Sequence, residues 1–155
     1  MNEQVAAVER AMVIIRRMQS RRMIGRLAGR SGAGGIPTNT AGFEVLDAVE
    51  AAELDGRQIG VTGVASALAV DQPRASRLVA DLVTAGLLRR EADQRDGRRT
   101  VLMRTAEGQA ASVVAHRFRQ SVLAAAMADF SPQEQADFAR LLTTFVGRLP
   151  TVPAP

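Results

Sequence analysis

The chain contains no cysteine, tryptophan, tyrosine or lysine, and it has a single histidine, His116. The absence of cysteine excludes a thiol-based redox switch and a cysteine-ligated metal site within the chain. With one histidine and no carboxylate pair or nucleophile motif in an apolar setting, we predict no enzyme activity and no catalytic residues. A metal-sensing regulator would lack its ligands, so we predict no metal and no cofactor, and expect His116 to be an exposed or capped side chain.

Aromatic residues are scarce, and all 5 are phenylalanines. Proteins that bind single-stranded nucleic acid normally stack bases on exposed aromatic rings, so this scarcity favours double-stranded DNA as the partner. The 20 basic residues are all arginines and exceed the 16 acidic ones, which gives a net charge of +4 and a pI of about 11.2. This excess agrees with nucleic-acid binding but does not establish it, because a GC-rich genome also explains an arginine-rich, lysine-free chain.

Long apolar runs are absent as well. No segment approaches the roughly 18 uninterrupted apolar residues of a membrane-spanning helix. The first residues lack the apolar core and cleavage site of a signal peptide. We therefore expect a cytoplasmic protein with no membrane segment, and its 155 residues suit one domain with a real core.

The most informative stretch begins at Asp71, which suits a helix N-cap, and Pro73 falls in the first turn that follows. Apolar residues then recur at spacings of three and four. They are Ala75, Leu78, Val79, Leu82 and Val83. Gly86 is typical of the position just past a helix end. The pattern predicts a helix with one apolar face and an opposite face that carries Arg74 and Arg77.

A hairpin is predicted directly after this helix. Leu87 to Glu91 and Thr100 to Arg104 are strand-like runs, and the arginine-rich segment between them contains Gly97 to ease the turn. A helix with a basic outer face followed by a basic hairpin is the arrangement of a winged helix-turn-helix. In that arrangement the helix enters the major groove of DNA and the hairpin forms the wing.

The wing region also carries a motif in three parts: Gly86-Leu87-Leu88-x-Arg90, Asp96-Gly97-Arg98 and Thr105-x-x-Gly108. In this order and spacing it resembles the MarR family of bacterial transcriptional regulators. In that family G-L-hydrophobic-x-R opens the wing, D-x-R lies in it, and L-T-x-x-G opens the next helix. Arg104 departs from the pattern, because the family usually has leucine before the threonine; the departure leaves the packing of the second strand's end open but not the fold.

Upstream of Asp71 we predict a long helix from Val5 to about Ala28 and then a glycine-rich flexible link, Gly29 to Thr40. The link lacks the G-K-[ST] of a phosphate-binding loop and is looser than the family's connection. A helix from Ala41 to Leu54 follows, and Arg57 to Gly60 can supply a short strand beside the wing. Thr62 is predicted to cap a helix from Gly63 to Ala69, which pairs with the recognition helix.

Downstream of the wing, Thr105 is predicted to cap a long helix that runs to about Asp129. Ser131-Pro132-Gln133-Glu134 is a capping box with proline at the first helical position, so the last helix begins there. The proline-rich end of the chain cannot continue a helix.

We therefore predict a mainly α fold with a small β-hairpin wing. The winged helix-turn-helix occupies residues 41–105, flanked by an N-terminal dimerisation helix (1–30), C-terminal dimerisation helices (106–149) and a disordered tail (150–155). The outer helices carry more apolar residues than they need to cover the winged unit, so a monomer would leave an apolar patch exposed. Exposed apolar patches usually mark interfaces. The family resemblance implies that they interlock two subunits; the alternative is that they pack only within their own chain.

A two-fold dimer would offer two recognition helices to an inverted-repeat site. Arginine can contact guanine and glutamine can contact adenine, while arginines in the wing can reach the minor groove or its phosphates. The predicted DNA-binding residues are Gln72, Pro73, Arg74, Ser76, Arg77, Arg95, Arg98 and Arg99. We expect Asp96 and Arg90 to orient the wing, and for Arg98 the alternative is a salt bridge to Asp96 that only holds the hairpin.

The resulting functional hypothesis is a sequence-specific regulator that binds double-stranded DNA, a repressor released by a small-molecule effector. The family resemblance implies an effector pocket for small aromatic or anionic compounds, but the sequence does not identify the ligand-binding residues. The alternative is a winged-helix module for protein–protein contact without specific DNA binding. Such a module would leave the helix face neutral or acidic, and Arg74, Arg77 and the arginine-rich wing argue against it.

Overall fold

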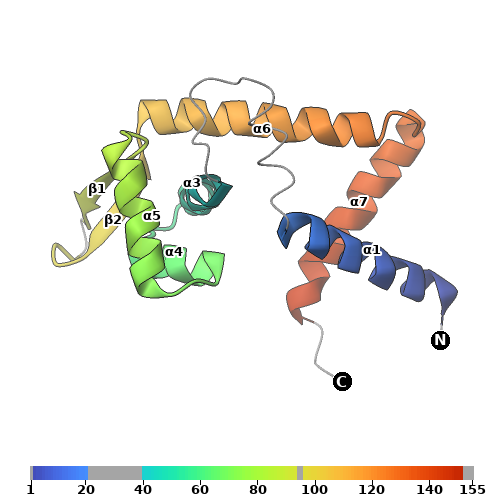
Figure 1. The fold of residues 1–155 in the computed structure, drawn as a ribbon, viewed down its shortest axis with the longest axis horizontal. Helices are drawn as coiled ribbons and strands as arrows, with labels where there is room; N and C mark the ends of the chain where they lie inside the picture. The colour runs from blue at the N-terminus through green and yellow to red at the C-terminus, as the bar shows by residue number, and fades with distance from the viewer. Residues whose placement is uncertain (1, 21–39, 94–95, 152–155) are drawn as a thin grey trace. The chain divides into compact units, whose positions relative to one another are not determined.

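The computed structural model describes residues 2–20, 40–93 and 96–151 (Figure 1). The helices are α1 (Glu3–Ser20), α3 (Thr40–Leu54), α4 (Val61–Leu68), α5 (Gln72–Thr84), α6 (Ala106–Ala126) and α7 (Pro132–Arg148). Strands β1 (Leu88–Ala92) and β2 (Thr100–Arg104) form an antiparallel hairpin, and a short 3-10 turn, η1 (Leu149–Thr151), follows α7. The predicted mainly α fold with a hairpin wing is confirmed.

The chain divides into two compact units, Met1–Phe118 and Arg119–Pro155. In the first unit, α3, α4 and α5 meet the hairpin around one apolar core. Side chains from every one of these elements are almost fully buried in it: Val45, Leu46, Val49, Val64, Ala75, Val79, Leu88 and Leu102. Helix α3 contributes more of them than any other element, because its apolar residues recur at spacings of three and four and so share one face.

The tight turn between α4 and α5 depends on Ala69, which ends α4 in the left-handed conformation (φ 51°, ψ 44°). The N–H of Val70 donates to the carbonyl oxygen of Ala65 at 3.0 Å, which closes the turn against the end of α4. Two short helices joined in this way form the helix-turn-helix that the sequence predicted.

The prediction that Thr62 caps α4 is wrong. The helix begins at Val61, and the residue in the N-cap position, Gly60, has no side chain to make a capping hydrogen bond. A Cβ atom on Gly60 would lie 2.9 Å from the carbonyl oxygen of Thr100 at the start of β2. The close approach of the wing therefore selects glycine at this position over a capping residue.

The expected strand from Arg57 to Gly60 is also absent. Among the residues that the structure describes, the sheet contains β1 and β2 alone. The segment makes one strand-like contact with the wing, in which the N–H of Leu102 donates to the carbonyl oxygen of Ile59 at 2.8 Å. A single hydrogen bond fixes the position of the segment beside β2 without extending the ladder.

Thr105 joins the end of β2 to the start of α6, as predicted from its place in the motif. Its Oγ1 accepts a hydrogen bond from the N–H of Gly108 at 3.0 Å and donates one to the carbonyl oxygen of Gly86 at 2.6 Å. Gly86 has φ +73° and ends the preceding helical segment, as expected. A Cβ atom on Gly108 would lie 2.0 Å from the carbonyl oxygen of Leu87. In the Thr105-x-x-Gly108 motif, the threonine therefore ties α6 to the wing and the glycine makes room for it.

The outer helices agree with the sequence in part. Helix α1 ends at Ser20 in the described region, and the predicted continuation to Ala28 and the glycine-rich link lie in residues 21–39, outside that region. Helix α6 ends at Ala126 and not near Asp129. The capping box of α7 is confirmed, because the Oγ of Ser131 accepts from the N–H of Glu134 at 3.3 Å and the Glu134 side chain accepts from the N–H of Ser131 at 2.8 Å.

The predicted disordered tail begins too early at 150, because η1 includes Pro150 and Thr151. Residues 152–155 lie outside the described region. None of the described helices combines the length and the apolar character that crossing a membrane requires.

We predict opposite effects for the same substitution at two helical glycines. Gly147→Ala in α7 should raise the free energy of unfolding by about 1 kcal/mol, because alanine is the better helix former and nothing lies within 4 Å of the new methyl group. Gly108→Ala should lower it by roughly 1–3 kcal/mol or more, because the methyl group would overlap the Leu87 carbonyl. Urea unfolding of both variants measures this difference, and a stabilised Gly108→Ala protein would contradict the packing described.

Candidate nucleic-acid interface

Helix α5 has one buried face and one exposed face. Ala75 and Val79 are fully buried and Leu82 almost so, and these residues anchor the helix on the core. Because they occupy one side of the helix, the residues on its opposite side point to solvent. The exposed residues include all five predicted from this helix: Gln72, Pro73, Arg74, Ser76 and Arg77.

The first turn of α5 is held by side chains. Asp71 Oδ1 accepts a hydrogen bond from the N–H of Arg74 at 2.7 Å, which confirms the predicted N-cap. The side-chain amide of Gln72 donates to Thr62 Oγ1 on α4 at 3.3 Å. Thr62 therefore contacts the start of the recognition helix, a role that the capping prediction missed.

The guanidinium groups of Arg74 and Arg77 are available to a partner. Neither forms an ion pair or side-chain hydrogen bond with any residue that the structure describes. At a spacing of three residues they are neighbours on the helix surface. The exposed face of α5 therefore presents two uncompensated positive charges one turn apart.

Asp96 shapes the tip of the wing through the backbone. Its Oδ1 accepts a hydrogen bond from the N–H of Arg98 at 3.2 Å, and its carbonyl oxygen accepts from the N–H of Arg99 at 2.8 Å. The carbonyl oxygen of Arg99 in turn accepts from the N–H of Asp93 at 2.8 Å. Gly97 does not adopt a positive φ, so the turn depends on Asp96 more than on glycine.

This geometry positions the arginines of the wing. Arg98 and Arg99 are exposed, and no ion pair joins Arg98 to Asp96 in the described part of the hairpin. The alternative of a purely structural salt bridge is therefore not seen. Arg95 lies outside the described residues. Arg90 is exposed on β1 opposite Leu102, and its role in orienting the wing stays a prediction.

Arg104 occupies the end of β2 where the motif usually has leucine, and it pairs with two glutamates of α3. Its backbone N–H and its Nε donate to the carboxylate of Glu53, each at 2.8 Å, and its Nη1 donates to Glu50 Oε1 at 2.5 Å. The side chains of Arg104, Glu50 and Glu53 are only 10, 17 and 18% exposed. At the position where the family pattern has leucine, this strand end therefore packs through an ion cluster with α3.

The cluster extends to α6 through His116, which is not the freely exposed or capped side chain that we expected. His116 Nε2 lies 2.5 Å from Glu50 Oε2, and the imidazole is 43% exposed. Burial raises the pKa of Glu50, but hydrogen bonds from His116 and Arg104 outweigh burial and hold it below its usual value. Burial likewise lowers the pKa of Arg104, yet the two glutamates raise it overall. Both groups are therefore charged at neutral pH.

Little in the sequence indicated this cluster. Glu50 and Glu53 share a face of α3, but Arg104 and His116 are more than fifty residues away in the chain. Only the fold brings the four side chains together.

A sequence model of the MarR family matches residues 41–99, which span α3 to the wing. The match agrees with the resemblance drawn from the motif, and it covers the helix-turn-helix and the first strand and turn of the hairpin described above. No curated protein matches the chain by sequence.

Solved structures support the same fold. The reduced form of MarR from E. coli is 21% identical, with a TM-score of 0.63 over 88% of this chain and 94% of that one. MepR of S. aureus in complex with DNA is 21% identical, with a TM-score of 0.60 over 87% and 94% of the two chains. BpsR of Bordetella bronchiseptica is 20% identical, with a TM-score of 0.58 over 88% and 98%. At these identities the likeness establishes the fold alone.

We predict that removal of Arg104 destabilises the first unit far more than removal of an exposed arginine. Arg104→Ala leaves two largely buried carboxylates without their counter-charge and should lower the free energy of unfolding by about 2–4 kcal/mol. The control is Arg57→Ala, which removes an exposed ion pair with Asp55 (2.8 Å) and should cost less than about 0.5 kcal/mol. Denaturant unfolding provides the comparison, and equal losses would contradict a structural role for Arg104.

Proposed function

We propose that the chain is a sequence-specific transcriptional regulator that binds double-stranded DNA as a homodimer, a repressor released by a small-molecule effector. The observation that carries the proposal is the exposed basic surface of α5 and the wing, in which Arg74, Arg77, Arg98 and Arg99 point to solvent. The structural match to a MepR–DNA complex supports the use of this surface for duplex DNA.

Each part of the surface has a separate task. Helix α5 is of a size and capping suited to the major groove, where Gln72, Arg74 and Arg77 would reach base edges or nearby phosphates. Arg98 and Arg99 in the wing would contact the minor groove or its flanking phosphates. Asp96 would keep the wing arginines in place through the backbone, since phosphates would repel its own charge.

Dimerisation is proposed from the apolar residues that the outer helices leave exposed. On α1, the predicted apolar residues Val5, Val8, Met12 and Ile15 are 39–61% exposed. On α7, Phe138, Leu141 and Leu142 are similarly exposed, as is Leu149 in η1 directly after it. Patches of this kind usually mark interfaces, and a two-fold dimer would pair the two recognition helices with an inverted-repeat site.

Release by an effector is proposed from the family. In BpsR, 6-hydroxynicotinic acid, a small aromatic anion, regulates DNA binding. A comparable ligand bound to this chain would change the spacing of the two recognition helices and shift the population away from the DNA-competent state.

We predict that single arginine substitutions on the proposed surface weaken DNA binding. Arg74→Ala, Arg77→Ala and Arg98→Ala should each cost about 1–3 kcal/mol of binding free energy, and a lost phosphate contact should also reduce the salt slope by roughly one unit. Arg140→Ala on α7 is the control, because it removes the same charge from an exposed arginine that does not belong to the helix-turn-helix or the wing. Fluorescence anisotropy at several salt concentrations measures these effects, and unchanged affinity in the Arg98 variant would remove the wing from the interface.

The operator and the oligomeric state can be tested together. Selection of bound duplexes from a random DNA pool should yield an inverted repeat, and sedimentation of the free protein should give a dimer. Failure to select any duplex at low salt would favour a protein-contact module. A monomeric protein would contradict the proposed arrangement of two recognition helices.

A further inference from the structure

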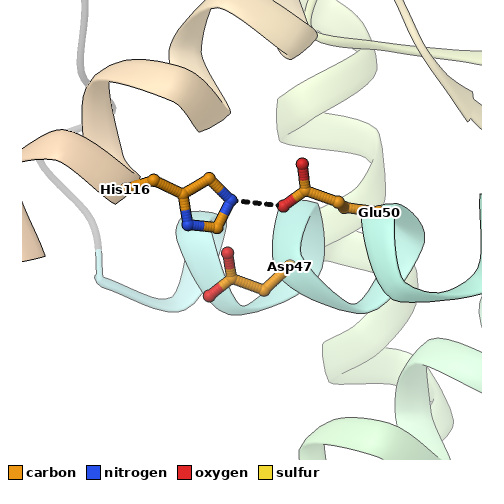
Figure 2. Close-up of side chains that lie close together, drawn as sticks. All are labelled: Asp47, Glu50 and His116. Carbon is orange, nitrogen blue, oxygen red and sulfur yellow. Dashed lines mark hydrogen bonds and ion pairs between the residues drawn. The ribbon is translucent and has the colours of Figure 1, made fainter. Parts of the chain in front are cut away.

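Three potential metal ligands from two helices converge in the first unit. Asp47 and Glu50 belong to α3 and His116 to α6, and one ligand atom from each lies within 4.8 Å of the others. Figure 2 shows both carboxylates directed towards the imidazole ring. All three residues are half-buried, so the group differs from the exposed acidic clusters that are common on protein surfaces.

The chemistry of the three atoms favours a divalent transition-metal ion. Imidazole nitrogen together with carboxylate oxygen suits Zn²⁺ and its first-row neighbours, whereas Ca²⁺ and Mg²⁺ prefer oxygen alone. Two carboxylates and a neutral imidazole carry two negative charges, which match the charge of the ion. Three protein ligands also leave a position for water, as in many zinc sites.

The carboxylate of Glu50 is already oriented for this role. Arg104 holds its Oε1, and Oε2 is turned towards His116. Glu53 accepts two hydrogen bonds of 2.8 Å from Arg104 and compensates its positive charge. Arg104 therefore orients Glu50 while the negative charge of Glu50 stays available to a cation. Hydrogen-bonded partners of this kind are typical around metal ligands, where they fix the direction of the donor atom.

A second observation lies on the same face of α6. Ser112, one helical turn before His116, is 1% exposed, and its Oγ has no hydrogen-bond partner in the described structure. A buried hydroxyl without a hydrogen-bond partner lowers stability. Apolar packing alone therefore does not explain why this face of α6 carries both Ser112 and His116.

We propose that Asp47, Glu50 and His116 form a binding site for one divalent transition-metal ion, with Zn²⁺ as the ion to test first. The ion would replace the hydrogen bond between Glu50 and His116 and join α3 to α6. Zinc bonds of ~2.0–2.2 Å place ligand atoms ~3.3 Å apart. The Glu50–His116 pair, now at 2.5 Å, must therefore open slightly, while the widest separation, within 4.8 Å, must close, and side-chain rotation can supply both.

The test is a zinc titration of the full, tag-free chain after treatment with a chelator, in the presence of excess Mg²⁺ and without DNA. Calorimetry should show one Zn²⁺ per chain, and saturating Zn²⁺ should raise the melting temperature. Because His116 is the only histidine and the chain has no cysteine, a histidine-dependent signal can arise only from this site. Absence of binding at about 100 µM Zn²⁺ would overturn the proposal.

Two variants make the assignment specific. His116→Gln keeps an N–H donor for Glu50 but not the imidazole, and Asp47→Asn keeps the side-chain shape but not the charge. Each should weaken zinc binding by roughly 100-fold or more, with circular dichroism confirming the fold. The control Asp55→Asn, an exposed aspartate outside the group, should bind zinc as the parent does. Zinc affinity that survives His116→Gln would overturn the site, whatever the outcome for DNA binding.

Discussion

The rest of the structure depends on the burial of one face of α5. Ala75, Val79 and Leu82 attach the helix to the core, and because helical side chains have fixed angular positions, this attachment alone decides that Arg74 and Arg77 face outward. No interaction of the arginines themselves is needed to hold them there. The hydrophobic effect orients the helix, and the charged face is left free for a polyanion. A polar residue at Val79 would therefore disturb the exposed arginine surface of α5 without touching it.

A second constraint joins this helix to the wing and to α6. Thr105 binds the carbonyl of Gly86 at the end of the α5 segment and caps α6, while Gly108 lets α6 approach Leu87. The hydroxyl of Thr105 thus holds the start of α6 to Gly86, 19 residues earlier, and the absence of a side chain on Gly108 allows this close approach. This explains in physical terms why a threonine and a glycine recur at that spacing in the motif.

The sequence predicted the helices, the hairpin and the exposure of the α5 arginines, because these follow from local periodicity and capping. It failed wherever a distant segment decided the outcome. Thr62 looked like a cap, but the close approach of β2 requires glycine at position 60. His116 looked isolated, because its partner Glu50 lies on another helix. The role of Arg90 still rests on the family pattern, and that of Arg95, which lies outside the described residues, rests on its place in the basic hairpin.

The joint between α3 and α6 shows why a polar cluster has consequences beyond stability. An apolar contact at Arg104 would hold the helices at least as well, since replacing a buried ion pair with packed apolar side chains is often neutral or stabilising. The cluster also fixes relative position. One oxygen of Glu50 on α3 bonds Arg104 on β2 and the other bonds His116 on α6, so α3 and α6 meet in one register. Arg104 therefore sets the direction of the Glu50 carboxylate as well as compensating its charge.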